Sequence, residues 1–111
     1  MGRAVKRGDV YWCSSRSPDK RRPVVVLTRD SAISFLAGIT VAPISTTVRG
    51  MASEVTLTPE QDGVLNICAV NVDNIQTLQK SRLDEFLTHL SADRMREVRS
   101  AIEFALGFDA F

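Results

Sequence analysis

Short extended segments separated by turn-forming residues dominate this sequence, and a helical pattern appears only near its end. The segments rich in β-branched and aromatic residues are 10–13, 24–28, 39–46, 53–58 and 64–72. Helices therefore do not alternate with strands, which argues against a parallel α/β sheet. We predict a mainly β fold, a small and strongly curved barrel or sandwich, with a C-terminal helix.

The closing helix is predicted by its end signals and by its apolar spacing. Ser91 is a good N-cap, and Gly107 is a natural end point. Between them, apolar residues recur at spacings of three and four, at Met95, Val98, Ile102, Ala105 and Leu106. We expect this helix to cover the core rather than to bind a ligand.

Three shorter features refine the expected fold. Pro43 cannot donate a hydrogen bond to a neighbouring strand, so it predicts an edge position or a bulge for residues 39–46. Residues 80–83 indicate a helical turn. Residues 85–90 indicate a short strand or an extended link.

Length and charge limit the organisation of the chain. Its 111 residues, 44% of them hydrophobic, predict one globular domain over residues 1–111. The net charge of +1 hides an uneven distribution. Residues 1–50 carry nine Lys and Arg against three Asp, whereas residues 51–111 carry five Lys and Arg against ten Asp and Glu. The N-terminal half is therefore suited to meet a polyanion.

Several kinds of site are excluded by what the sequence lacks. Cys13 and Cys68 show no C-x-x-C spacing and His89 is the single histidine, so neither a zinc site nor a Ser–His pair is expected. No glycine-rich phosphate loop or dinucleotide fingerprint occurs. No apolar run approaches the roughly 20 residues that cross a bilayer, and no cleavable signal segment is evident. We expect a cytoplasmic protein with buried, reduced thiols, without a metal or cofactor and without membrane association.

An Arg-Pro step at the head of one predicted strand and a run of hydroxyls at the end of the next form the strongest candidate site. Arg22 carries a permanent charge and a planar fork of donors that matches phosphate oxygens. Pro23 favours an extended backbone at Arg22 and so directs the guanidinium away from the strand start. Ser45, Thr46 and Thr47 supply the hydroxyls. A solvated charge and ordinary strand-ending hydroxyls are the alternative interpretation.

Two further segments are candidates for contact with a polyanion. The loop of residues 14–21 ends in cations that include Lys20 and Arg21, and it is either the lip of a groove or an ordinary solvated connection. Residues 71–77 contain Asn, Asp and Gln side chains that can contact base edges, although the same residue types are common in turns.

Several segments occur in an order that resembles one known family. They are Arg7-Gly8-Asp9-Val10-Tyr11, Arg22-Pro23-Val24-Val25-Val26, Thr40-Val41-Ala42-Pro43-Ile44-Ser45, and Asn74-Ile75-Gln76-Thr77 followed by Lys80, Arg82 and Leu83. With the closing helix, they resemble the MazF/PemK toxin family over nearly the whole chain. The resemblance implies an SH3-like barrel of the MazF/CcdB type that forms a homodimer. It also implies the toxin of a type II toxin–antitoxin system, a sequence-specific, metal-independent endoribonuclease acting on single-stranded RNA, with a cognate MazE-like antitoxin.

The resemblance also assigns roles to residues. Arg22 would bind and stabilise the phosphate while the adjacent 2′-OH attacks it, giving a 2′,3′-cyclic phosphate and a 5′-OH. The family usually has threonine where this chain has Ser45, which leaves open whether Ser45 or Thr46 acts beside Arg22. The residues expected to bind RNA are Lys20, Arg21, Thr47, Arg49, Asp73, Asn74 and Gln76.

Two other functions stay open. The related CcdB-like toxins carry the same barrel but inhibit DNA gyrase by binding it, without a catalytic pair. A family member that has lost cleavage and only binds RNA or antitoxin is the other alternative, because every candidate catalytic residue also has a binding role. Arg22, Ser45 and the basic N-terminal half favour the ribonuclease.

Overall fold

The computed structural model describes residues 3–14 and 21–110. In this part of the chain the strands are β1 (Asp9–Cys13), β2 (Arg22–Val26), β3 (Gly38–Ser45), β4 (Glu54–Leu57), β5 (Cys68–Asn71), β6 (Gln76–Gln79) and β7 (Leu83–His89). The α-helices are α1 (Asp30–Ile33), α2 (Pro59–Asp62) and α3 (Ala92–Ala105). Short 3₁₀ helices are η1 (Val72–Asn74), η2 (Lys80–Arg82) and η3 (Phe108–Ala110).

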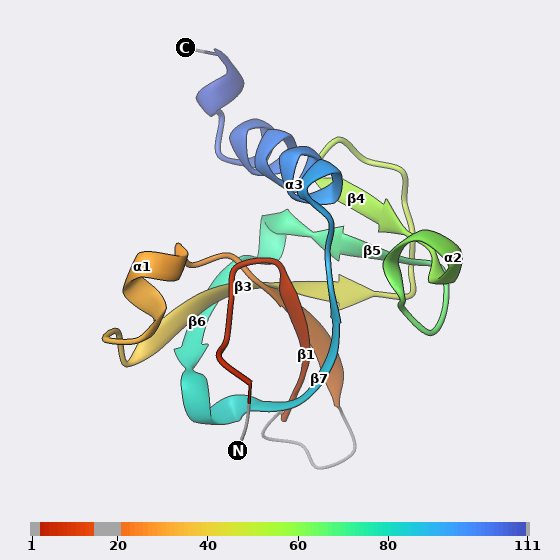
Figure 1. Cartoon of the computed structure of the whole chain (residues 1–111). Helices are drawn as coiled ribbons and strands as arrows, with labels where there is room; N and C mark the ends of the chain where they lie inside the picture. The colour runs from red at the N-terminus through yellow and green to blue at the C-terminus, as the bar shows by residue number, and fades with distance from the viewer. Residues whose placement is uncertain (1–2, 15–20, 111) are drawn as a thin grey trace.

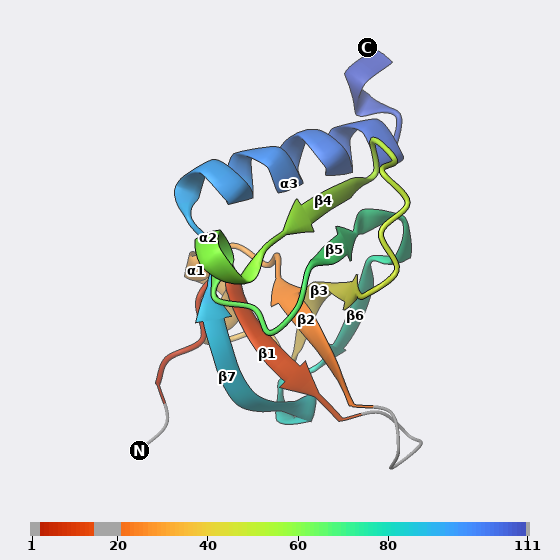
Figure 2. The same cartoon turned by 90° about the vertical axis from the view of Figure 1, so that its right-hand side faces the viewer.

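These strands form one curled antiparallel sheet (Figures 1 and 2). The strand order is β4-β5-β3-β2-β1-β7, and β6 joins the sheet by pairing with β3. Among the described residues no pairing links β4 to β7, so the sheet curls without closing. Helix α3 lies across one side of this sheet (Figure 2). The predicted mainly β fold with a C-terminal helix is confirmed.

The central strands are buried on both faces. Val10 and Val25 lie in a core cluster that α3 covers with Val98 and Ala101. The residues of β1 and β2 that point to the opposite face, Tyr11, Val24 and Val26, lie in a second cluster. Ile39, Val41 and Leu78 from β3 and β6 complete this cluster. Successive side chains of a strand point to opposite faces, so a strand that serves two clusters is apolar throughout. This explains why β2 shows no polar alternation after Pro23.

Strand β3 changes its partner part-way along its length. On one side it pairs with β2, which places Val24 opposite Pro43. On the other side its first half pairs with β6 up to Val41, and its last two residues pair with β5 from Ile44. Of the two alternatives predicted from Pro43, an edge position or a bulge, the edge position is wrong, because β3 is central. Pro43 lies in the gap between the pairing with β6, which ends at Val41, and the pairing with β5, which begins at Ile44.

The segment before β5 differs from the prediction of a strand over residues 64–72. Gly63 adopts a left-handed φ of 73° at the end of α2, and the chain bends through residues 65–67 before β5 begins at Cys68. Leu65 and Ile67 are exposed, at 67% and 60%. Strand β6 was not predicted, because only Leu78 among its four residues is buried. The helical turn predicted over residues 80–83 is confirmed as η2, which ends at Arg82, and of the two alternatives for residues 85–90 the strand is confirmed as β7, which begins earlier, at Leu83.

The predicted limits of the closing helix hold closely. Ser91 Oγ accepts a hydrogen bond from the Arg94 N–H at 3.1 Å, which caps the first turn of α3. Gly107 follows the helix with a φ of 80°. Leu106, expected on the apolar stripe, is exposed beyond the last turn. None of the helices in the described ranges is long and apolar enough to cross a membrane.

Candidate active site

The register of β2 and β3 brings the two halves of the predicted site together. Val24 lies opposite Pro43 in this antiparallel pair. The same register, continued by two residues, places Arg22 across from Ser45. A cation at the start of one strand and hydroxyls at the end of the next therefore lie at the same end of this central strand pair.

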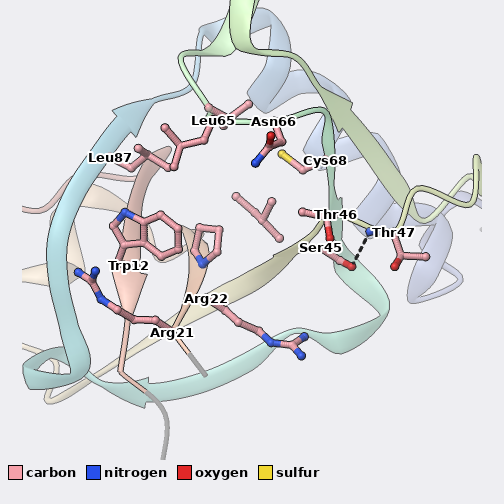
Figure 3. Close-up of a pocket in the computed structure, with 13 residues that line it drawn as sticks. Trp12, Arg21, Arg22, Ser45, Thr46, Thr47, Leu65, Asn66, Cys68 and Leu87 are labelled. Atoms are coloured by element: carbon pink, nitrogen blue, oxygen red, sulfur yellow. Dashed lines mark hydrogen bonds between the residues drawn. The ribbon is translucent and has the colours of Figure 1, made fainter. Parts of the chain in front are cut away.

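Both groups line an open pocket of about 460 Å³ (Figure 3). Its polar lining includes Arg21, Arg22, Ser45, Thr46 and Thr47. The remaining lining residues are Trp12, Pro23, Ile44, Val64, Leu65, Asn66, Cys68 and Leu87. Cationic and hydroxyl groups thus share one cavity with an apolar wall.

Arg21 and Arg22 leave the start of β2 in opposite directions (Figure 3). Arg21 donates to Glu85 at 3.0 Å, and its guanidinium carbon lies 5.2 Å from the centre of the Trp12 ring. The side chain of Arg22 is exposed and makes no hydrogen bond or ion pair with any residue in the described ranges. Its five donors can therefore bind an anion that enters the pocket.

The hydroxyl of Ser45 is held in place by the backbone that follows it. Its Oγ accepts a hydrogen bond from the Thr47 N–H at 3.0 Å (Figure 3). Since this bond uses a lone pair, the hydroxyl proton of Ser45 is still available for donation. Within the described residues the hydroxyl of Thr46 makes no such contact and its side chain is exposed. This geometry favours Ser45 over Thr46 as the oriented hydroxyl beside Arg22.

Other predicted RNA-binding residues lie outside this pocket. The Arg49 N–H donates to Glu54 Oε1 at 2.9 Å, and Asp73 Oδ2 accepts from Ser53 Oγ at 2.6 Å. Asn74 and Gln76 are exposed on η1 and β6. Their RNA contacts stay predictions, as does that of Lys20, which lies outside the described residues.

Comparison with known proteins decides the family. Residues 6–106 match the profile of the PemK-like, MazF-like toxins of type II toxin–antitoxin systems. The chain belongs to this family. The resemblance predicted from the segments around Arg22 and Ser45 is therefore confirmed.

Individual relatives of the toxin agree with this assignment. It is 44% identical over 100 residues to the Mycobacterium tuberculosis protein named "Probable endoribonuclease MazF5", covering 90% of this chain and 91% of that protein. The solved structure of "Mycobacterium tuberculosis toxin MazF-mt6" matches with a TM-score of 0.80 and 34% identity, over 89% of this chain and 96% of the other. A mycobacterial endoribonuclease solved with its cognate antitoxin matches with a TM-score of 0.84 and 28% identity, over 94% and 96%.

Part of the toxin's pocket was missed from the sequence. Trp12, Leu65, Asn66 and Leu87 come from β1, β7 and the bend before β5. Trp12 and Leu87 carried a weak signal, because both lie on segments predicted to be extended and only half of such a segment faces the core. Leu65 and Asn66 carry no such signal, since the sequence predicts a regular strand where the structure has a bend.

The cysteine in the pocket is not poised to react. Cys68 is free and buried, and burial raises the pKa of its thiol, an effect to which the charge of Asp62 adds. The thiol is therefore protonated at neutral pH, whereas the thiolate is the nucleophile and metal ligand. Burial likewise raises the pKa of Cys13. No cluster of three or more His, Cys, Asp or Glu within residues 3–14 and 21–110 is placed to hold a metal ion.

Proposed function

We propose that this toxin is a sequence-specific, metal-independent endoribonuclease that cleaves single-stranded RNA in the cytoplasm. The observation that carries the proposal is the pocket that Arg22 and Ser45 line together, in which the guanidinium of Arg22 is free of any partner among the described residues. Relatives named endoribonuclease support the choice of RNA as substrate. No feature of the pocket favours the inhibition of gyrase.

The reaction needs little from the protein because RNA carries its own nucleophile. The 2′-oxygen attacks the adjacent phosphorus, the bond from phosphorus to the 5′-oxygen breaks, and the proton of the 2′-OH is lost while the leaving oxygen gains one. The products are a 2′,3′-cyclic phosphate and a 5′-OH. Negative charge grows on the non-bridging oxygens at the pentacoordinate stage, where fixed donors are most effective. The protein has to align these atoms and stabilise that charge.

Arg22 and Ser45 divide this task. The guanidinium of Arg22 would bind two phosphate oxygens at once, and its permanent charge makes it an electrostatic stabiliser rather than a base. Ser45, oriented by the Thr47 N–H, would donate its proton to a phosphate oxygen. Thr46 is the alternative hydroxyl, and Arg21 and Thr47 would contact the neighbouring phosphates.

We also propose a homodimer that a MazE-like antitoxin neutralises. Phe104, Leu106 and Phe108 are all about half exposed at the end of α3, and large exposed apolar groups in one place are typical of an interface. A solved relative that binds its cognate antitoxin supports the second partner. Sedimentation equilibrium over a range of concentrations tests the dimer, and a mass fixed at one chain would contradict it.

The central experiment incubates the purified toxin with a long single-stranded RNA in EDTA and maps the new ends. Discrete cuts with 5′-OH ends are expected, and they are lost with Arg22→Ala. Arg99→Ala is the matched control, because Arg99 is an exposed arginine on α3 that lies outside this pocket. Intact RNA under conditions where the toxin still halts growth would overturn the proposal and point to a target such as gyrase.

A further inference from the structure

The pocket of Arg22 has a second half that takes no part in phosphate chemistry. Trp12, Leu65 and Leu87 give it an apolar wall, and Leu65 is 67% exposed although it belongs to the cavity lining. Figure 3 shows this wall on the side of the cavity away from the Arg22 guanidinium. Unpaired RNA bases stack on aromatic and apolar side chains, and each base lies one sugar away from its phosphate. An apolar wall with one aromatic ring beside a phosphate site therefore fits a nucleobase.

One polar side chain, that of Asn66, lies beside this apolar wall. Asn66 lies between Leu65 and Cys68 at the rim of the pocket (Figure 3). Its amide is exposed and makes no hydrogen bond with any residue in the described part of the chain. A side-chain amide offers two donors and one acceptor, which is the combination that recognises base edges.

We infer that Trp12, Leu65 and Leu87 form the subsite for the nucleobase next to the scissile phosphate, and that Asn66 selects this base by its edge. The inference rests on the proposed ribonuclease function, because it takes RNA as the ligand of the pocket. It makes Asn66 a specificity-determining residue, whereas Arg22 acts on every substrate. The segment of residues 64–67 becomes a recognition element.

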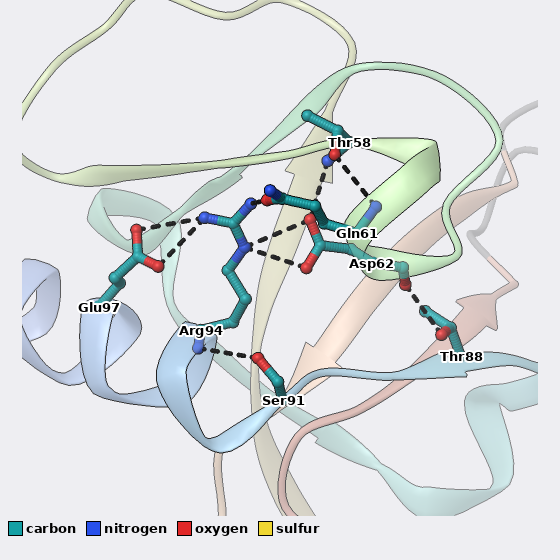
Figure 4. A network of polar contacts seen from close by, with 7 residues as sticks. All are labelled: Thr58, Gln61, Asp62, Thr88, Ser91, Arg94 and Glu97. Atoms are coloured by element: carbon teal, nitrogen blue, oxygen red, sulfur yellow. Dashed lines mark hydrogen bonds and ion pairs between the residues drawn. The ribbon is translucent and has the colours of Figure 1, made fainter.

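An asparagine on a bend selects a base only if the bend is held still. The segment starts from α2, which is fixed by a polar network centred on the buried Asp62 (Figure 4). Asp62 accepts from Arg94 Nε at 3.0 Å and from the Thr58 N–H at 2.9 Å, while its backbone carbonyl accepts from Thr88 Oγ1 at 2.9 Å. The carboxylate is only 1% exposed, so these bonds compete little with water.

The next residues continue this constraint up to β5. Gly63 has a φ of 73°, and a Cβ at this position would lie 2.7 Å from Thr88 Oγ1, so the chain leaves α2 in close contact with β7. Val64 is buried in the core, and Cys68 pairs with Leu57 in the ladder of β4 and β5. Asn66 is therefore presented by a short segment fixed at both ends. Such preorganisation is what selective recognition requires.

The test is a cleavage profile on a pool of RNA with a randomised stretch, sequenced at the new ends. With Asn66→Ala, the toxin is expected to cut with the same 5′-OH chemistry, while its preference at one position next to the cut falls about tenfold. Asn66→Asp removes the donors and keeps acceptors, so the preference at that position should move toward bases that offer an N–H. Gln79→Ala is the matched control, since Gln79 is an exposed amide outside the pocket. An unchanged profile for both Asn66 variants would overturn the inference.

A second part of the experiment, the binding arm, measures binding without cleavage. It tests the base subsite separately from the proposed ribonuclease function. The same pool made with 2′-fluoro nucleotides lacks the nucleophile, so the toxin can bind it but cannot cut it. Sequences that the toxin retains should be enriched in one base at one position, and Asn66→Ala should remove that enrichment. If the wild-type toxin cuts nothing, the proposed function fails and the binding arm alone decides the subsite. Absence of any enriched base in this arm would overturn the inference, as would enrichment that survives Asn66→Ala.

Stacking on the wall predicts a different signature. Trp12→Leu should weaken binding of the 2′-fluoro pool about tenfold for all sequences, because every base has a face to stack. The base preference set by Asn66 should persist in this variant. Thermal unfolding of Trp12→Leu shows whether the half-buried side chain is also needed for the fold. A folded Trp12→Leu toxin with unchanged affinity would contradict the stacking role.

Discussion

Arg22 lines the pocket and Arg94 is bonded to Asp62 on α2, just before the pocket residues Val64 and Leu65, yet the surroundings of the two arginines are opposite. Arg94 is 17% exposed, and its guanidinium donates to Asp62, Glu97 and Gln61 (Figure 4). These contacts raise the pKa of Arg94, chiefly through the hydrogen bond to Asp62. Arg22 is exposed and has no such partner among the described residues.

The difference separates a structural arginine from one available for a ligand. The donors of Arg94 are occupied by carboxylates and an amide, so this residue joins α2 to α3 and has no capacity for a phosphate. The hydrogen-bond donors of the Arg22 guanidinium are instead available to an anion that enters the pocket. The charge is the same in both residues, and the partners decide its use.

The largest expected effect comes from breaking the structural pair. Arg94→Ala leaves Asp62 buried and unpaired, which should lower the free energy of unfolding by about 3–5 kcal/mol. Urea denaturation measures this loss. Arg96→Ala is the matched control, because Arg96 is 71% exposed and its one ion pair within the described ranges is with the exposed Asp93, and such pairs contribute at most about 1 kcal/mol. Equal losses in the two variants would show that the buried network adds no stability.

A double replacement sharpens this result. Asp62→Leu combined with Arg94→Leu removes both charges, so it should recover part of the stability that Arg94→Ala loses. The recovery is incomplete because Asp62 also accepts from the Thr58 N–H. A double variant less stable than Arg94→Ala would mean that shape rather than charge dominates at this position.

Arg22→Ala should show the reverse pattern. Cleavage should fall about 10²- to 10³-fold, the range for loss of one donor to a developing oxyanion. The free energy of unfolding should change by less than about 0.5 kcal/mol, since an exposed side chain without partners contributes little. Single-turnover cleavage and urea denaturation of the same sample measure both quantities. Arg22→Lys keeps the charge but loses the fork, so an intermediate rate is expected.

Substitution of the hydroxyls gives a smaller effect. Ser45→Ala removes one neutral donor and should slow cleavage about tenfold. A loss of this size corresponds to the upper end of the free energy that a single hydrogen bond usually contributes. Ser45→Thr keeps the hydroxyl and should retain most of the activity. Thr46→Ala is the matched comparison for the same rate measurement. A greater loss with Thr46→Ala than with Ser45→Ala would transfer the catalytic role to Thr46.

The sequence predicted those parts of the site that adjacent residues determine. Arg22 with Pro23, and the hydroxyls from Ser45 onward, lie at strand ends that β-branched residues define, and their meeting follows from one antiparallel register. The closing helix was predicted because Ser91 and the apolar spacing are local signals.

The remaining parts depend on contacts between distant segments. Strand β6 exists because it pairs with β3, and its own polar residues give no strand pattern. The bend at Leu65 and Asn66 is set by Gly63 packing against Thr88 on β7, which no local pattern indicates. The bond between Asp62 and Arg94 joins residues 32 positions apart. The sequence therefore indicates Arg22 through its neighbour Pro23, whereas the partners that occupy Arg94 are revealed only by the fold.

The smallest expected effect concerns the thiol of Cys68, which lines the pocket of Arg22 and senses the charge of Asp62, the partner of Arg94. Burial, followed by the charge of Asp62, raises the pKa of Cys68 above its ordinary value of 9.0, so the folded state holds this proton more tightly than the unfolded chain. Stability from this group is complete below about pH 9 and is lost as the pH rises through the folded-state pKa. Urea denaturation between pH 7 and pH 10 should therefore show a decline in the free energy of unfolding, and the decline should be shallower in Cys68→Ala. The buried Cys13 and Tyr11, whose pKa values are also raised, leave part of the decline in that variant. An identical pH dependence in both proteins would contradict this prediction. It would mean that neither burial nor the charge of Asp62 makes ionisation of the Cys68 thiol harder in the folded state than in the unfolded chain.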